Sequence, residues 1–326
     1  MDKIINIPAV KDYNDHWGVP TRHPYVNIIE GSQITRPIPN CRKNMGMYVI
    51  FLKDVMCADY LTYGRQEYDY QVNTLVFTAP GQVFGHPRDG STYRAKGWVL
   101  YFSPELLHGT SLGRHIKDYT FFSYAANEAL HVSERERETI IDCFRKIDDE
   151  INYGNDRHSN TIIASAIELF LNYCLRFYDR QFITRKKVNK DLLVRFEELV
   201  DTYFSSGEAQ RHGTPTVAWC ASRLCLSANY FGDLIKKEIG ITAQEYIRQK
   251  TMDVAKDRLA DPRQSISEIA YYLGYQYPQY FSRAFKKAVG TTPVDYRRTL
   301  LDSKAKTPVI TAFIQLVFIL LLIVIL

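Results

Sequence analysis

The sequence lacks the cysteine and histidine patterns that mark disulfide-stabilised domains and metal centres. Its 326 residues contain six cysteines, but no Cys-x-x-Cys pair and no metal-binding His-x-His. We therefore expect reduced thiols, no disulfide framework and no bound metal. The first residues, Met1–Asn6, include no apolar run behind a basic start, so we expect no secretory signal peptide and a cytoplasmic protein.

Catalytic signatures are missing too. The sequence has no Gly-x-Ser-x-Gly, no phosphate-binding glycine loop followed by Lys, and no His-Glu-x-x-His. Hydrophobic residues make up 46% of the chain and charged residues 24%, which excludes wholesale disorder and a polytopic membrane protein. We therefore expect a globular protein of one to three domains that is not an enzyme and needs no cofactor.

Positive charge is concentrated in the C-terminal part of the chain. Residues 186–306 contain 20 Lys and Arg against 14 Asp and Glu, whereas residues 1–185 contain 21 against 22. A basic module attached to a nearly neutral one favours a protein that binds a polyanion through its C-terminal part.

Residues 1–130 are predicted to be mainly β-structure. Short runs rich in β-branched and aromatic residues, at 46–52, 73–78 and 97–102, are separated by turn-forming Pro and Gly. Short strands at this spacing predict a sandwich or a small barrel, whose interior can hold one small ligand. Four aromatic residues either line a pocket for an aromatic or sugar ligand or belong simply to the core: Tyr48, Phe77, Trp98 and Tyr101.

Helical periodicity replaces the strand pattern in residues 131–185. Ser133 and Glu136 have the spacing of a capping box, and apolar residues then recur every three or four positions. A second helix, predicted over residues 161–178, is apolar on most sides, so it packs either on its own barrel or against a second subunit. We expect this region to link the domains and to pair two chains as a homodimer.

The strongest signal is an internal repeat. An offset of 49 residues aligns Val217 with Ile266, and an offset of 50 aligns Phe231 with Phe281. The extra residue falls between two helical patterns, where a turn tolerates it. Each copy is predicted to form a helix, a short turn and a second helix, the arrangement in which the second helix enters the DNA major groove.

The second copy carries clear signals for its helix ends. Ser265 and Glu268 have the spacing of a capping box. Gly274 can adopt the left-handed conformation that ends a helix, and Pro278 suits the first turn of the next helix. In the first copy, Cys225 stands where the second has that glycine.

One side of the second helix in each copy is predicted to face DNA. Asn and Gln can pair with adenine, Arg with guanine, and Asp can accept from cytosine, whereas Lys contacts to phosphate position the helix without reading sequence. The predicted base-reading residues are Asn229, Asp233, Gln279 and Arg283, and the predicted phosphate contacts are Lys236, Lys237, Lys286 and Lys287. The predicted inner face of the last helix is Phe281, Ala284, Phe285 and Ala288. The alternative is a pair of helical hairpins with ordinary solvated faces.

A longer motif carries a family resemblance: Ile266, Ile269-Ala270, Gly274-Tyr275, Tyr280-Phe-Ser-Arg283, Phe285-Lys-Lys287, Gly290, Thr292-Pro293 and Tyr296-Arg297. With it, residues 190–300 resemble the DNA-binding domain of the AraC/XylS family of bacterial transcription regulators, except that Tyr275 stands where Phe is usual. The resemblance implies a connecting helix at about 242–259 and two second helices that face successive major-groove segments. Residues 79–83 and 97–104 are similar, more loosely, to the family's cupin-like sensor region.

The resemblance implies an α+β multidomain architecture. Its segments are a cupin-like ligand-sensing barrel (1–130), a helical dimerisation and linker region (131–185), and an all-α DNA-binding domain (186–300) with helix-turn-helix units at about 216–240 and 265–290. A basic linker and apolar tail (301–326) follow, beyond the point where the family's pattern normally ends. The implied function is sequence-specific regulation of transcription, with promoter DNA, a small-molecule effector and a second subunit as partners. The implied location is the cytoplasm, at the nucleoid. Two alternatives are a cupin-type enzyme with accessory helices and a membrane-anchored protein whose repeat binds another protein.

The tail ends in an apolar run. Residues 309–326 contain only Thr311 and Gln315 as polar side chains, and Lys304 and Lys306 precede them. As a helix of about 1.5 Å per residue the run would span about 27 Å, slightly less than a hydrocarbon core. Two interpretations stay open: an anchor that tethers the regulator at the inner membrane, and an extension without a selected role.

Overall fold

The computed structural model describes residues 4–34, 37–39, 41–53, 73–85, 92–93, 96–125, 128–154, 156–184 and 186–302. The apolar tail and its predicted membrane contact lie outside the described residues. Contacts between Cα atoms divide the chain into two compact units. The first comprises residues 1–189 and 226–234, and the second comprises residues 190–225 and 235–326.

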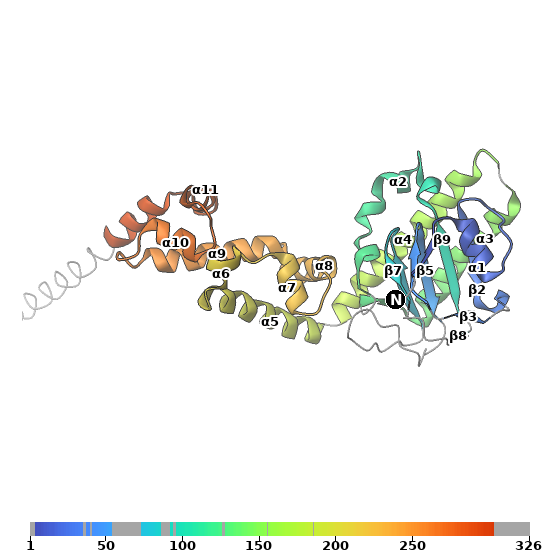
Figure 1. The fold of residues 1–326 in the computed structure, drawn as a ribbon, viewed down its shortest axis with the longest axis horizontal. Coiled ribbons are helices and arrows are strands. Elements are labelled where there is room, and N and C mark those ends of the chain that lie inside the picture. The colour runs from blue at the N-terminus through green and yellow to red at the C-terminus, as the bar shows by residue number, and fades with distance from the viewer. Residues whose placement is uncertain are drawn as a thin grey trace, which may run out of the picture. The chain divides into compact units, whose positions relative to one another are not determined.

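Among the described residues of the first unit, ten strands form three sheets (Figure 1). The strands are β1 (Ile5–Ile7), β2 (Val26–Glu30), β3 (Ile38–Pro39), β4 (Lys43–Met45), β5 (Tyr48–Lys53), β6 (Thr74–Thr78), β7 (Val83–Phe84), β8 (Thr92–Tyr93), β9 (Trp98–Phe102) and β10 (Leu130–His131). The sheet orders are β1-β4-β7, β10-β6-β5-β9-β2 and β3-β8. The three strands expected from the sequence are therefore β5, β6 and β9, side by side in the five-stranded sheet. The described strands form a mixed α+β unit with separate sheets, and they do not close into one barrel.

The five-stranded sheet is covered on both faces. On one face, Val49, Val99 and Tyr101 share a core with Trp17 of helix α1 (Val10–Trp17) and with Met45 of the three-stranded sheet. We call this the inner face. On the other face, helices α3 (Glu134–Tyr153) and α4 (Ser159–Thr184) pack against the sheet and each other. The short helix α2 (Ser111–His115) also packs on α4.

Helices α3 and α4 begin and end for identifiable reasons. Ser133 caps α3, and Glu136 reaches back to the Ser133 amide, which confirms the predicted capping box. Helix α4 runs six residues past the predicted end at Tyr178. The Gln181 side chain accepts from the His131 amide at 2.8 Å, a bond to another element that periodicity alone does not predict.

Among the described residues, no helix combines the length and the apolar character that crossing a membrane requires.

The second unit is built from helices. In chain order these are α5 (Lys186–Ser205), α6 (Glu208–His212), α7 (Val217–Arg223), α8 (Ala228–Ile239), α9 (Ala243–Leu259), α10 (Ile266–Tyr272) and α11 (Pro278–Val289), followed by a helical stretch at 293–302. Helices α5 and α8 each begin in the first unit and end in the second. Ser265 caps α10 through the predicted capping box, and the Thr242 side chain caps α9.

The turns inside the two copies differ in how they tolerate a side chain. Gly274 has a φ of +89°, and a Cβ there would lie 2.5 Å from the carbonyl carbon of Gly213 and 2.6 Å from the Ala209 oxygen. Cys225, in the corresponding place, has a φ of +60° but is exposed. Both turns need the left-handed conformation, which only glycine adopts cheaply, and the second turn also has no room for a side chain.

We expect Gly274→Ala to lower the free energy of unfolding by about 2 kcal/mol or more, because left-handed strain and backbone overlap act together. Cys225→Gly relieves strain at an open position and changes the free energy by less than about 1 kcal/mol. Urea unfolding of both variants beside the parent chain measures the difference. An equal effect at the two positions would contradict this explanation.

Candidate nucleic-acid interface

Helix α11 is held by a few aromatic contacts along one side. Phe281 and Phe285 are completely buried, with their ring centres 5.7 Å apart. Tyr275 and Tyr296 pack against these two rings at 5.6 and 5.4 Å. Because side chains three or four positions apart share one face of a helix, these contacts fix which side of α11 faces solvent.

The predicted inner face of α11 is correct only in part. Ala284 is half-buried beside the two phenylalanines, but Ala288 is exposed, so its placement in the core is wrong. Ala288 lies in the last turn, before the left-handed Gly290. Helical spacing predicts which side of the helix a residue lies on, up to the last turn. A residue on that side is buried only where another element packs against the same turn.

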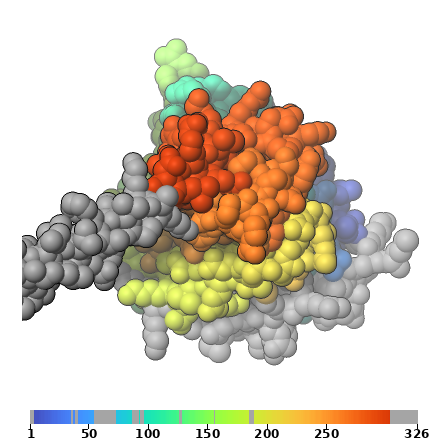
Figure 2. Space-filling view, turned by 90° about the vertical axis from the view of Figure 1, so that its left-hand side faces the viewer, coloured from blue at the N-terminus to red at the C-terminus, as the bar shows by residue number. Residues whose placement is uncertain are grey.

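The opposite side of α11 carries the predicted DNA contacts. Gln279, Arg283, Lys286 and Lys287 are all exposed. Figure 2 looks onto the surface made by α9, α10 and α11, drawn in orange to red. Pro278 occupies the first turn, and the N–H of Gly290 donates to the carbonyl of Lys286. The stripe therefore lies along a helix whose two ends are both defined.

The ion pairs described in the second unit lie outside α11. Several basic side chains of the second unit are neutralised by nearby acids, in the pairs Arg248–Glu245, Lys250–Asp201, Lys256–Asp253, Arg263–Asp261 and Arg298–Asp295. Within the described residues, Arg283, Lys286 and Lys287 have no acidic partner. Three positive side chains without an acidic partner thus lie together on the exposed side of α11, where a polyanion can reach them.

Three exposed tyrosines on or beside α10 and α11 are further candidates that the sequence pattern did not reveal. Tyr271, Tyr277 and Tyr280 are each about half exposed, at 51%, 52% and 53%. The rings of Tyr277 and Tyr280 meet edge to face at 5.6 Å. Tyrosine hydroxyls are common donors to phosphate oxygens, so these side chains are further candidate contacts. The available signal was their spacing, because all three fall outside the apolar pattern of α10 and α11.

Helix α8, the second helix of the first copy, differs from α11. Asn229, Lys236 and Lys237 are exposed, as expected for DNA contacts, but Asp233 is half-buried. The Asp233 carboxylate accepts hydrogen bonds from Thr120 Oγ1 at 2.7 Å and Tyr124 Oη at 2.6 Å. All three residues belong to the first compact unit. In this state the carboxylate is occupied by protein donors, so it is not available to accept from cytosine.

A second polar contact holds the start of the same helix. Glu128, only 2% exposed, accepts from the Ser227 amide at 2.6 Å and from the Ser227 hydroxyl. Burial raises the pKa of Glu128, although the Ser227 bonds oppose the rise. Burial and the bond to Asp233 likewise raise the pKa of Tyr124. Tyr124 therefore stays protonated and keeps donating to Asp233 at physiological pH.

The four predicted pocket residues do not lie together. Strand register places Tyr48, Phe77 and Trp98 on the helix-covered face of the five-stranded sheet and Tyr101 on the inner face. All four therefore cannot line one cavity. Phe77 lines a cavity of about 40 Å³ together with Phe121, Tyr124 and Tyr178, a volume that suits little more than one water molecule.

Within the described ranges, no group of three His, Cys, Asp or Glu side chains could hold a metal ion.

Removing the Tyr124 hydroxyl tests the contact to Asp233. We expect Tyr124→Phe to lower the free energy of unfolding of the first unit by about 1–3 kcal/mol, because a half-buried carboxylate loses a donor. Tyr153→Phe is the matched control, since Tyr153 is 83% exposed. It should change the unfolding free energy by less than about 0.5 kcal/mol. Thermal and denaturant unfolding measure both, and equal effects would show that the bond contributes nothing.

Comparison with known proteins supports the same part of the chain. A family model described as a helix-turn-helix domain matches residues 220–299. The HTH-type transcriptional regulator YtdP of Bacillus subtilis is 32% identical over 112 residues, which are 34% of this chain and 14% of YtdP. The arabinose operon regulatory protein of Salmonella typhimurium is 30% identical over 144 residues, or 44% of this chain and 48% of that protein. The chain spans about half or less of the length of these curated relatives.

A solved structure covers the same region. The C-terminal domain of the two-component response regulator yesN from Fusobacterium nucleatum is 33% identical, with a TM-score of 0.28. The match covers 31% of this chain and 96% of that domain. The tandem helical repeat and the matches to the family model and the curated relatives agree on one conclusion. The C-terminal part of the chain carries a helix-turn-helix domain of the AraC/XylS type.

Proposed function

We propose that the protein is a sequence-specific DNA-binding regulator of transcription, acting in the cytoplasm at the nucleoid. The observation that carries the proposal is the exposed, unpaired stripe of Gln279, Arg283 and Lys286 on α11. A major groove admits one helix, and the stripe combines base-reading and phosphate-binding side chains on the side that would enter it. Relatives named as transcriptional regulators support a non-enzymatic function.

Each residue of the stripe has a distinct role in this proposal. Arg283 reads guanine through two hydrogen bonds, and Gln279 pairs with adenine. Lys286 and Lys287 contact phosphates, together with Lys236 and Lys237 on α8, and they position the helices without reading bases. Because phosphate contacts release counterions, affinity should fall steeply as salt rises. Asn229 can read a base directly, whereas Asp233 can do so only after its present partners leave.

The contact at Asp233 suggests how a ligand could act. We propose that an effector bound in the first unit changes the position of Tyr124 and so frees Asp233 and the start of α8. The two carboxylates that hold this segment, Asp233 and Glu128, are both bonded in the state described here. A ligand that prefers the other state shifts the population by its difference in affinity for the two states.

Homodimer formation has its own support in α4. Ile162, Leu169 and Ile183 are 49%, 45% and 55% exposed and are separated by multiples of seven residues. Residues seven apart lie close to one side of a helix, so these side chains form an apolar stripe in solvent. Other residues of α4, such as Phe170, are buried within the unit. Helix α4 therefore packs on its own unit and keeps a second apolar side, which we propose pairs with the same helix of another chain.

Arg283→Ala tests the DNA proposal on sequences selected from a random duplex library. We expect it to cost about 1–3 kcal/mol and to relax specificity at one base position. Lys286→Ala should weaken binding to all sequences alike and reduce the salt slope by about one. Fluorescence anisotropy at several salt concentrations measures both. An equal loss on every sequence would make Arg283 a phosphate contact, and no binding by the parent chain at low salt would refute the proposal.

Leu169→Glu tests the dimer proposal. A charge in the centre of the stripe should convert dimers to monomers over the micromolar range, as measured by sedimentation velocity. Lys146→Glu on α3 is the control, because it places the same side chain at an exposed position outside the stripe. Dimers that survive Leu169→Glu would exclude α4 as the pairing surface.

A further inference from the structure

The second helices of the two copies differ in how much of one side is covered. Positions 50 residues apart correspond, so Tyr230 of α8 matches Tyr280 of α11, and each is the third residue of its helix. Tyr280 is 53% exposed, whereas Tyr230 is only 5% exposed. Because the same residue type stands at the same turn of both helices, the difference arises from what packs against α8.

The side chains that cover Tyr230 come from outside the helical repeat. Residues 226–234 belong to the first compact unit. The Tyr230 ring packs against the rings of Tyr124 and Phe182, each with its centre 5.2 Å away. The contact with Tyr124 is edge to face, an arrangement that aromatic pairs favour. Tyr230 is therefore enclosed by the first unit and not by its own helical hairpin.

Polar contacts extend this cover by one turn in each direction. Ser227 donates to the Glu128 carboxylate before Tyr230, and Asp233 accepts from Tyr124 after it. Residues three apart lie on neighbouring turns of one side of a helix. The first unit thus covers one continuous side of α8, from the residue before the helix to its second turn.

The covered positions of α8 correspond to open positions of α11. Ser227 matches Tyr277, which is 52% exposed, and Asp233 matches Arg283, which is also exposed. Arg283 lies on the side of α11 that we propose enters the major groove. By the repeat, the equivalent side of α8 is the one that would meet DNA, and in this state it is the side that the first unit occupies.

The covering groups have the chemistry of the DNA groups that α8 would meet. Glu128 is 2% exposed, and its carboxylate accepts from both the amide and the hydroxyl of Ser227. A backbone phosphate is likewise an anion that accepts from amides at helix N-termini and from serine hydroxyls. The Tyr124 hydroxyl donates to Asp233, as the amino group of cytosine can.

We propose that Ser227, Tyr230 and Asp233 form the DNA-contacting side of α8, and that Tyr124 and Glu128 occupy this side in place of DNA. The inference rests on the proposed function and adds two contact residues, Ser227 and Tyr230, and a competitor within the chain. Ser227 and the Tyr230 hydroxyl bind phosphate oxygens once the cover opens. Because only the open fraction of molecules can use α8, the cover lowers the apparent affinity for DNA.

The test compares full-length variants on a duplex selected from a random library with the open variant itself. Tyr124→Phe combined with Glu128→Gln weakens the cover and leaves every residue of α8 unchanged. We expect this double variant to bind the duplex at least fivefold more tightly than the parent chain, as measured by fluorescence anisotropy. Equal affinities of parent and double variant overturn the proposal.

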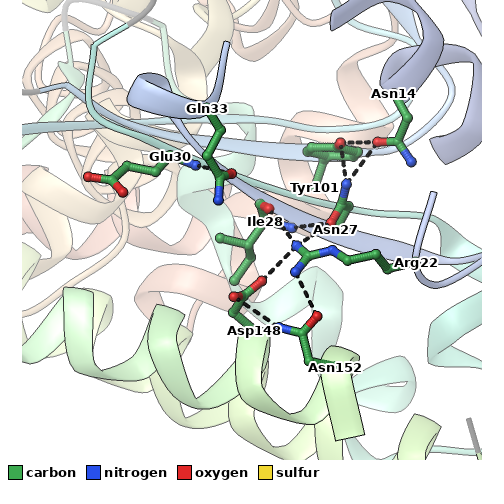
Figure 3. Close-up of polar contacts among 9 residues, drawn as sticks. All are labelled: Asn14, Arg22, Asn27, Ile28, Glu30, Gln33, Tyr101, Asp148 and Asn152. Carbon is green, nitrogen blue, oxygen red and sulfur yellow. Dashed lines mark hydrogen bonds and ion pairs between the residues drawn. The ribbon is translucent and has the colours of Figure 1, made fainter. Parts of the chain in front are cut away.

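A control separates uncovering of α8 from general loosening of the first unit. Figure 3 shows a polar cluster of that unit built from β2, α3 and the chain before β2. Arg22 donates to Asp148 Oδ1 at 2.7 Å, to Asn27 Oδ1 at 2.9 Å, to the Ile28 carbonyl at 3.1 Å and to Asn152 Oδ1 at 2.9 Å. Asp148→Asn removes the charge of this ion pair and should change DNA affinity less than twofold. A rise equal to that of the double variant overturns the proposal.

The contact role of Tyr230 is tested in the double variant, where the cover no longer competes. Tyr230→Ala should weaken DNA binding there at least fivefold, and Tyr280→Ala is the matched change in the second copy. Tyr230→Phe keeps the ring, covers the case that the alanine variant folds poorly, and should weaken binding at least twofold. DNA affinity that neither Tyr230 variant changes overturns the assigned side of α8.

Failure of this inference and failure of the proposed function give different results. If the parent chain and the double variant bind the duplex equally well, the inference falls and the proposed function stands. If neither binds duplex DNA at low salt, the proposed function is refuted, and the inference falls with it.

Discussion

The burial of Phe281 and Phe285 is the constraint on which the functional surface depends. Two aromatic side chains one helical turn apart fix the rotation of α11 about its axis, because both rings are completely enclosed. Gln279 and Arg283 then face solvent by geometry alone. The orientation of the predicted base-reading residues is thus a consequence of core packing, and the polar residues of the stripe contribute little to holding the helix in place.

The basic side chains of the protein differ in whether they have an acidic partner. Most basic residues near α9 have acidic neighbours on the same or an adjacent turn, and Arg22 has four acceptors. Surface pairs of this kind contribute little to stability, but they neutralise the field around them. On α11, Arg283, Lys286 and Lys287 have no acidic partner among the described residues and are open to water. Their charge is therefore available to a polyanion.

Local rules predicted much of the fold. The capping boxes at Ser133 and Ser265, the left-handed Gly274 and the central strands follow from interactions within a few residues, so one sequence suffices to find them. The sequence could not show which face of each helix or strand packs against another element. Ala288 has the spacing of a core residue but no neighbour to cover it, and Asp233 is bonded to residues more than one hundred positions away. The pocket residues were chosen by type, whereas strand pleat decides which of them share a face.

The unequal turns of the two helical copies have an evolutionary consequence. A duplicated unit usually leaves both copies free to drift, but the second turn is closed on three sides by backbone atoms and admits only glycine. The first turn is open to solvent and already carries a cysteine. Side chains at this turn are therefore tolerated in the first copy and excluded in the second, so the two repeats place unequal constraints on sequence change.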